Sequence, residues 1–294
     1  MTDEEAVVQQ GADADVEGAG WWQVVGVVGL GAMGGPIARH LLDAGVEVVV
    51  ADLDAGAVAT CAQAGARAAE DLPDLAAHSD VVLVVVATDE EVLAVCSGDR
   101  GLLVACRPGT AVLLCSSVRP DTCADVTDAA PRGVAVLDAA LTGGVRGAEN
   151  GSINLLVGGD AAVLDRLRPI LAPWTSSVHH LGPLGAGQVG KTVNNLVHWA
   201  QISAITEALE LGRRYGLDVP TLRRALMDGP TDSRTLREME QMRFTWHAKD
   251  LANAENMAAR VDLPLPVAET AREVMKRTTV EGVAALLSGR HLTP

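Results

Sequence analysis

Residues 24–54 read VVGVVGLGAMGGPIARHLLDAGVEVVVADLD. An apolar run predicts a buried strand over 23–28, and an amphipathic helix follows before a second apolar run at 46–51. Three glycines in G-x-G-x-x-G spacing stand between the first strand and the helix, where they permit a tight turn, close backbone approach to a phosphate, and close helix–strand packing. The stretch therefore predicts a dinucleotide-binding turn formed by Gly29, Leu30, Gly31, Ala32, Met33 and Gly34.

The second strand of this stretch ends at Asp52, 21 positions after Gly31. A carboxylate at about this offset accepts hydrogen bonds from the adenosine ribose and repels a 2′-phosphate. Leu53 and Asp54 follow and supply no guanidinium for such a phosphate. The sequence therefore favours NAD over NADP, although Asp52 and Asp54 could also simply open a turn.

Working outward, apolar β-branched runs alternate with helical segments as far as residue 184, which is typical of a parallel sheet covered by helices. Strands are predicted at 23–28, 46–51, 81–86, 111–115, 134–138 and 152–157. Beyond Gly185 the pattern is helical, with helices predicted at 189–215, 219–227, 249–260 and 265–288. We expect an α/β, Rossmann-like doubly wound parallel sheet domain over 21–184 and an all-α C-terminal domain over 185–294, beginning with a long interdomain helix.

Charge and hydropathy exclude several classes of protein. The formal net charge is −15, and nucleic-acid binding needs clustered Lys and Arg, so we expect no nucleic-acid partner. Residues 1–20 hold six acids and no base, which predicts a disordered acidic tail and not a secretory leader. No apolar run approaches the roughly 18 residues of a membrane span, so we expect no membrane partner.

The cysteines at 61, 96, 106, 115 and 123 are odd in number and show no C-x-x-C pairing. We interpret them as buried, reduced thiols of a cytoplasmic protein, and we expect no metal site.

A polar stripe marks the start of the long predicted helix. Lys191, Asn194, Asn195 and His198 share one face of a segment that is otherwise mostly apolar. A solvated first turn would explain such a stripe, but burial at a domain interface would instead lower the pKa of Lys191 and suit it to general acid/base catalysis. Asn195 could then hold a substrate oxygen, while Trp199 is interpreted as a core residue.

A second candidate site follows the strand at 134–138. Thr142, Gly143 and Gly144 combine a hydroxyl with two glycine N–H groups, which could form a neutral cradle for an anion. An ordinary flexible loop explains the same residues equally well.

Five segments together resemble the β-hydroxyacid dehydrogenase family, whose members include 3-hydroxyisobutyrate dehydrogenase. They are GLGAMGGPIA in the glycine turn, SSVRP at 116–120, DAALTGGVRGA at 138–148, GAGQVGKTVNN at 185–195 and KDLANA at 249–254, in this order over nearly the whole chain from 22 to 288.

The resemblance implies roles for individual residues. Lys191 would be the catalytic proton donor and acceptor, and Asn195 would bind substrate. Thr142, Gly143 and Gly144 would hold the substrate carboxylate, whereas Ser117 and Lys249 would contact the cofactor and Asp250 would be a structural neighbour. It also implies a 6-phosphogluconate dehydrogenase-like C-terminal domain and a homodimer or homotetramer.

This chain departs from the family pattern at three places. Ala140 and Thr142 stand where Pro and Ser are common, ATDEEV at 87–92 lacks a proline that many relatives have, and the stretch between Gly229 and Lys249 is short. These departures put the substrate in doubt, and not the chemistry.

The leading hypothesis is reversible, NAD-dependent oxidation of a small β-hydroxyacid to its semialdehyde. An imine reductase on the same fold is the nearest alternative, but such enzymes typically carry Asp or Tyr at the position of Lys191. A decarboxylating 6-phosphogluconate-type enzyme is less favoured, because the chain lacks a longer C-terminal region and a Lys-His pair. A catalytically silent dinucleotide-binding protein is the alternative of a different class.

Overall fold

The computed structural model describes residues 23–290, so the acidic segment 1–20 lies outside the described residues. Eight strands form one sheet in the order β3-β2-β1-β4-β5-β6-β7-β8. The strands are β1 (Val24–Val28), β2 (Glu47–Ala51), β3 (Arg67–Ala68), β4 (Val81–Val84), β5 (Ala111–Leu114), β6 (Ala135–Thr142), β7 (Ile153–Gly158) and β8 (Thr175–Gly182). The predicted class, a Rossmann-like sheet domain followed by a helical domain, is confirmed.

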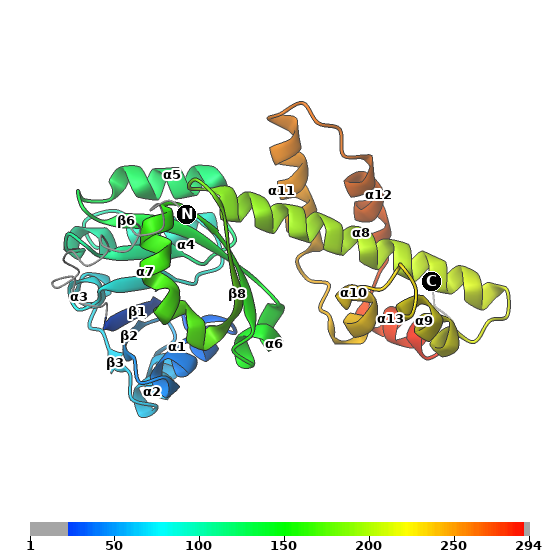
Figure 1. Cartoon of the computed structure of the whole chain (residues 1–294), viewed down its shortest axis with the longest axis horizontal. Helices are drawn as coiled ribbons and strands as arrows, with labels where there is room; N and C mark the ends of the chain where they lie inside the picture. The colour runs from blue at the N-terminus through cyan, green and yellow to red at the C-terminus, as the bar shows by residue number, and fades with distance from the viewer. Residues whose placement is uncertain (1–22, 291–294) are drawn as a thin grey trace, which may run out of the picture.

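Helices cover both faces of the sheet (Figure 1). Alternate side chains of the strands point to opposite faces, so Val27 joins one hydrophobic core and Val28 the other. One core includes side chains from α1 (Gly34–Asp43), α2 (Ala55–Gln63), α6 (Gly144–Glu149) and α7 (Ala161–Leu171). The other includes side chains from α3 (Leu72–Ala77), α4 (Asp89–Cys96) and α5 (Pro120–Ala129).

The sheet differs from the predicted one at its far edge. All six predicted strands are present, but β7 pairs antiparallel with β6, and β8 then pairs parallel with β7. The link between β6 and β7 holds only the six-residue α6, which is too short for the crossover that parallel pairing needs. Strands β3 and β8 were not predicted, because β3 has two residues and β8 is polar and half-exposed.

The C-terminal domain is built around α8 (Ala186–Arg214), a helix of 29 residues that leaves the sheet domain and carries the remaining helices on its sides (Figure 1). These are α9 (Val219–Met227), α10 (Arg234–Glu238), α11 (His247–Ala259), α12 (Pro266–Met275) and α13 (Val280–Leu287). The single helix predicted over 265–288 is wrong: Thr279 accepts a hydrogen bond from the Gly282 N–H and starts α13 as a separate helix. The short α10 was also not predicted.

The strand order reverses between β1 and β4, which lie side by side in parallel. In open α/β sheets, the carboxyl ends of the strands at such a switch point form the ligand-binding crevice. The glycine turn follows β1 there, and the loops after β4 and β5 lie alongside. Two ion pairs, Arg146–Glu238 and Arg260–Asp121, connect the sheet domain to the helical domain on this side. Over residues 23–290, no helix is long and apolar enough to cross a membrane.

Candidate active site

The glycine turn is shaped by two close backbone approaches. Gly29 has a φ of +91°, and a Cβ there would lie 2.3 Å from the Val85 carbonyl oxygen. A Cβ on Gly34 would lie 1.9 Å from the Gly29 carbonyl oxygen. Gly31 is different, because a Cβ there would meet nothing within 4 Å. The turn therefore needs Gly29 and Gly34 for its own packing and leaves open space at Gly31, where a pyrophosphate would fit.

The other residues of the turn divide between core and surface. Leu30 is buried in the core and Ala32 is exposed. Met33 precedes α1, whose first turn receives no side-chain cap from the described residues. The uncapped N–H groups and the helix dipole favour a bound phosphate. The turn thus fits the nicotinamide dinucleotide expected from its sequence.

Asp52 braces the glycine turn from the end of β2. One carboxylate oxygen accepts a hydrogen bond of 2.5 Å from the Leu30 N–H, and the other accepts one of 2.8 Å from the Asp54 N–H. This structural task was not foreseen from the sequence. Asp52 therefore joins the two loops that would hold the adenosine half of the cofactor.

Gln188 connects the loop 115–119 after β5, which contains Ser117 and is called the second cofactor loop, to the long helix. The Val118 N–H donates to Gln188 Oε1 at 3.1 Å, and Gln188 Nε2 donates to the Ser116 carbonyl at 2.9 Å. Gln188 is buried, and Ser117 lies between the two loop residues that it contacts. No role for Gln188 is predicted from the sequence. A polar side chain that is buried at the start of a helix needs hydrogen-bond partners such as these.

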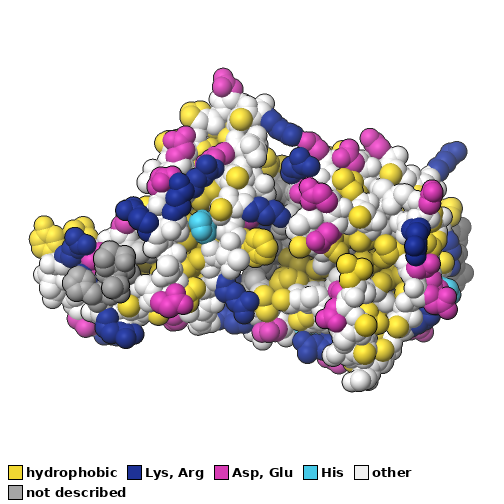
Figure 2. Space-filling view, turned by 180° about the vertical axis from the view of Figure 1, so that it is seen from behind, with side chains coloured by type: hydrophobic (Ala, Val, Ile, Leu, Met, Phe, Trp, Pro, Cys, Tyr) yellow, Lys and Arg dark blue, Asp and Glu magenta, His cyan; other side chains and the backbone are white. Residues whose placement is uncertain are grey.

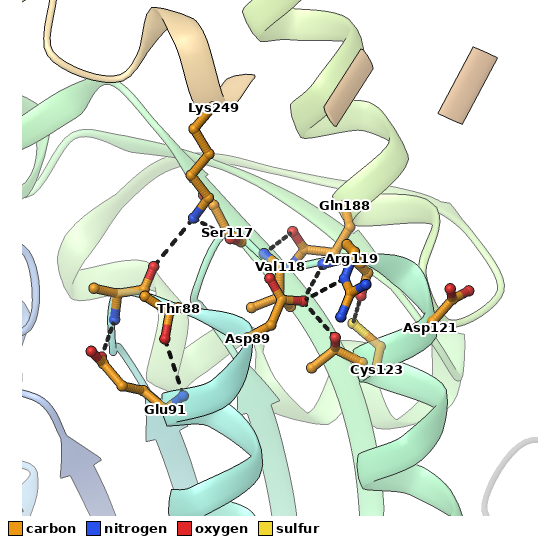
Figure 3. A network of polar contacts seen from close by, with 12 residues as sticks. Thr88, Asp89, Glu91, Ser117, Val118, Arg119, Asp121, Cys123, Gln188 and Lys249 are labelled. Carbon is orange, nitrogen blue, oxygen red and sulfur yellow. Dashed lines mark hydrogen bonds and ion pairs between the residues drawn. The ribbon is translucent and has the colours of Figure 1, made fainter. Parts of the chain in front are cut away.

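Lys249 reaches from α11 to the sheet domain, where its ammonium lies 3.3 Å from the Ala87 carbonyl oxygen and 3.4 Å from that of Ser117 (Figure 3). These carbonyls belong to the loops after β4 and β5. Lys249 therefore ties the helical domain to both loops at the mouth of the crevice.

The loop 87–92, which departs from the family pattern, is held by its own side chains (Figure 3). The Thr88 hydroxyl accepts from the Glu91 N–H, and the Glu91 carboxylate accepts from the Ala87 N–H. Asp89 accepts hydrogen bonds from the Arg119 N–H and from the Thr122 hydroxyl. Burial opposes ionisation of Asp89, but these hydrogen bonds outweigh it and lower the pKa of its carboxyl. The acidic loop therefore fixes the backbone that Lys249 contacts.

The buried Asp138 anchors the first turn of α8. It is fully buried on β6 and accepts hydrogen bonds from the N–H groups of Gly185, at 2.6 Å, and Gln188, at 2.8 Å. Burial raises the pKa of Asp138, and these hydrogen bonds oppose that effect. The start of α8 is thus fixed to the sheet domain, one turn before Lys191.

Lys191 lies in a small cleft between the second cofactor loop, α8 and α11. The residues lining this cleft are Ser117, Val118, Gln188, Lys191, Thr192, Asn195, Asp250 and Asn253. Burial lowers the pKa of the Lys191 amine, and the nearby Asp250 carboxylate offsets part of that effect. Asn195 is buried beside it and accepts a hydrogen bond from the exposed Asn194 amide. The cleft therefore places the amine of the half-buried Lys191 next to an amide and a carboxylate.

The structure also places Trp199 and His198 behind this cleft. The indole N–H of the buried Trp199 donates to the Asp250 carboxylate at 3.0 Å. His198 Nδ1 lies 3.1 Å from the Thr235 hydroxyl, and burial followed by the charge of Lys191 lowers the pKa of the imidazole. Asp250 was expected only as a structural neighbour. Its hydrogen bond to Trp199 joins residues 51 positions apart, so no local pattern could have indicated it.

Thr142, Gly143 and Gly144 are not among the residues that line the cleft at Lys191. The buried Thr142 hydroxyl donates to the Asn154 carbonyl at 2.8 Å and accepts from the Asn154 amide. Gly143 and Gly144 have φ values of +113° and +65°, and Gly144 is exposed. The Thr142 hydroxyl is thus hydrogen-bonded to the neighbouring strand β7. The backbone of Gly143 and Gly144 is the part of this loop that remains accessible.

Comparison with known proteins gives a family match for each of the two parts of the chain. Residues 24–182 match the NAD-binding domain of 6-phosphogluconate dehydrogenase. Residues 185–286 match the corresponding region of NADP-dependent 3-hydroxyisobutyrate dehydrogenase, described as NAD-binding. The chain belongs to the β-hydroxyacid dehydrogenase family. It is therefore an NAD(P)-dependent oxidoreductase that acts on a CH–OH group.

Relatives within the β-hydroxyacid dehydrogenase family match over most of their length. The chain is 32% identical to 2-(hydroxymethyl)glutarate dehydrogenase of Eubacterium barkeri, over 90% of this chain and 91% of that protein. It is 39% identical to NAD-dependent L-serine dehydrogenase of Pseudomonas aeruginosa, over 67% of each. The structure of Mycobacterium tuberculosis 3-hydroxyisobutyrate dehydrogenase with L-serine is similar with a TM-score of 0.78 and 28% identity, covering 87% of this chain and 93% of that one.

Proposed function

We propose that the enzyme catalyses reversible, NAD-dependent oxidation of a small β-hydroxyacid to its semialdehyde, with Lys191 as the proton acceptor. The observation that carries this proposal is the burial of the Lys191 amine in a cleft beside the second cofactor loop, with Asn195 and Asp250. Burial favours the neutral form of an amine, and a neutral amine can accept a proton.

The residues divide the work of the reaction. Oxidation breaks the C–H and O–H bonds of the alcohol and forms a carbonyl, so Lys191 takes the hydroxyl proton and Asn195 holds the oxygen or the carboxylate. When bound, the nicotinamide supplies the acceptor for the hydride. The glycine turn, Asp52, Ser117 and Lys249 would hold that cofactor. The Gly143 and Gly144 N–H groups would hold the substrate carboxylate, and Thr142, whose hydroxyl donates to Asn154, would support that loop.

The relatives suggest a substrate class. 2-(Hydroxymethyl)glutarate, L-serine and 3-hydroxyisobutyrate, the substrates in their names, all carry a hydroxymethyl group on the carbon next to a carboxylate. We propose that the substrate of this enzyme is likewise a 3-hydroxypropanoate with a substituent at carbon 2. The cofactor is proposed to be NAD, because Asp52 and the exposed Leu53 offer no cation to a 2′-phosphate.

The test is reduction of NAD and of NADP by the purified enzyme with a panel of these hydroxyacids. Turnover of at least one hydroxyacid with NAD is expected. Reduction of cyclic imines without hydroxyacid oxidation would instead support an imine reductase. Cofactor binding without any turnover would support a silent dinucleotide-binding protein, and either result would refute the proposal.

We also propose that the enzyme assembles into a homodimer or homotetramer. Val189, Val193 and Val197 form an exposed apolar stripe on α8 at helical spacing, and their side chains are 41%, 55% and 51% exposed. Figure 2 shows hydrophobic side chains gathered around the hollow between the two parts of the molecule. Exposed apolar patches of this kind mark interaction sites. Sedimentation equilibrium tests the assembly, and a monomer would contradict it.

The cytoplasm is the proposed compartment. All five cysteines are buried free thiols, and such thiols persist where the environment is reducing. Fractionation of cells with an antibody to the enzyme would test this, and recovery from an extracellular fraction would refute it.

A further inference from the structure

Trp199 links the long helix to the Asp250 carboxylate. It lies eight residues after Lys191 on α8, which is slightly more than two helical turns. Its side chain is 4% exposed, and its indole N–H donates to Asp250 Oδ2 at 3.0 Å. Asp250 comes from α11 and lines the same cleft as Lys191. The indole therefore fixes a charged group of one helix relative to an amine on the other.

The partner of this indole distinguishes Trp199 from an ordinary core residue. A buried indole N–H needs an acceptor, and a backbone carbonyl suffices, as for Trp174, whose N–H donates to the Ile170 carbonyl at 3.0 Å. Trp199 instead donates to a carboxylate. An indole has a single N–H donor, so Trp199 binds one oxygen of the Asp250 carboxylate and leaves the other oxygen free of the indole.

We propose that Trp199 is a positioning residue that holds the Asp250 carboxylate toward the Lys191 amine. This inference rests on the proposed role of Lys191 as proton acceptor. The charge of Asp250 stabilises the ammonium form of Lys191, whereas burial destabilises it. Burial has the larger effect on the pKa of Lys191, and the position of the carboxylate determines how much of that effect is offset.

The charged surroundings of Lys191 are few. Asp250 contributes from α11, and His198, whose pKa responds to both Lys191 and Asp250, contributes from α8. The cofactor loop facing the amine supplies Ser117 and Val118, neither of which is charged. The ring of His247 packs edge-on against Trp199 at 6.0 Å between centroids. Asp250 is therefore the acidic group through which a change at Trp199 reaches Lys191.

The test is Trp199→Phe, which keeps an aromatic ring and removes the donor. The chain has three lysines, at 191, 249 and 276, so NMR of the full enzyme with ε-13C-labelled lysine can follow Lys191 directly, and Lys191→Ala assigns its signal. The expected result is a Lys191 titration midpoint lower by about half to one pH unit, with the acid limb of kcat/KM for oxidation moving in the same direction. Trp174→Phe, which also removes a buried indole donor, should leave both unchanged.

Asp250→Asn keeps an acceptor for Trp199 and removes only the charge. It should lower the Lys191 midpoint by at least as much as Trp199→Phe, and the double variant should show no further shift. An unchanged midpoint in either single variant, equal shifts in Trp199→Phe and Trp174→Phe, or additive shifts in the double variant would overturn the inference. If Trp199→Phe does not fold, an unchanged Lys191 midpoint in Asp250→Asn still overturns the inference, because Trp199 would then hold a charge that does not reach Lys191. The NMR titration needs no turnover, so absence of hydroxyacid oxidation by the wild type would refute the proposed function separately.

Discussion

The carboxylate of Asp138 accepts a hydrogen bond of 2.8 Å from the backbone N–H of Gln188, three residues before Lys191. Its other oxygen accepts from the Gly185 N–H. A strand of the sheet thus supplies the cap that a helix normally takes from the residue preceding it, since α8 has only Gly185 there and no side-chain cap of its own.

Removing this cap should destabilise the enzyme. Asp138→Ala leaves two buried N–H groups unpaired and is expected to cost about 2–4 kcal/mol of unfolding free energy, measured by urea denaturation. Asp160→Ala is the control, because Asp160 caps α7 in the same way but at the surface, and about 1 kcal/mol is expected there. Equal losses for the two variants would show that burial of the Asp138 cap contributes nothing.

Replacing Lys191 by Met should separate catalysis from stability. Turnover should fall by at least about a hundredfold, while the enzyme becomes as stable as the wild type or more stable. Folding lowers the pKa of Lys191 below its ordinary value of 10.5, so the buried ammonium carries a penalty below its folded pKa that disappears as the pH rises toward 10.5. The stability gain should therefore be largest near neutral pH and shrink in alkaline solution.

Thermal melting of the wild type and of Lys191→Met from neutral to alkaline pH shows whether the variant is the more stable of the two and whether the difference shrinks as the pH rises. Lys276→Met is the control, since Lys276 forms a surface ion pair with Glu273. Loss of this ion pair should change neither the turnover of the enzyme nor the way its stability varies with pH around neutrality. A Lys191→Met enzyme that is less stable than the wild type at neutral pH would contradict the burial argument.

Cofactor choice should respond to position 53. Leu53 is fully exposed beside Asp52, so Leu53→Arg adds a cation for a 2′-phosphate without disturbing the fold. The ratio of kcat/KM for NADP to that for NAD should rise about tenfold, equivalent to about 1.4 kcal/mol. By contrast, Asp52→Ala should weaken both cofactors, because it also removes the brace on Leu30. If the NADP-to-NAD ratio does not change in Leu53→Arg, the 2′-hydroxyl of the adenosine ribose does not lie next to position 53.

The five thiols should be inert in the native enzyme. Burial raises the pKa of Cys96 and Cys115 to about 12 and that of Cys106 to about 11. Since the thiolate is the reactive form, a disulfide reagent at pH 8 should label none of them until the protein is unfolded in urea, when all five should react. Rapid labelling of any thiol in the native state would indicate local opening at that cysteine.

The sequence was informative where a signal is local. Apolar runs such as 81–86 predicted buried strands, and the glycine spacing predicted the turn after β1. Strand β8 could not be predicted, since its residues TSSVHHLG form a half-exposed edge with no apolar run. The break at Thr279 was missed because a capping threonine is inconspicuous between two helical stretches.

The same division holds for the candidate site. Lys191, Asn195 and Ser117, predicted as site residues, line one cleft. Two hydrogen bonds next to this cleft, between Asp138 and the start of α8 and between Trp199 and Asp250, join residues about fifty positions apart. Such pairs are fixed only when the chain is folded, so no spacing rule in a single sequence identifies them.

The long helix α8 is part of both domains. Its first turns are fastened to the sheet, and its later turns carry the other five helices. Lys191, the proposed proton acceptor, therefore lies near the end of α8 that Asp138 fixes to the sheet. Substitutions in α9, α10, α12 and α13, which contribute no residue to the cleft at Lys191, can therefore accumulate in the outer part of the molecule while α8 and α11 keep the lining of that cleft.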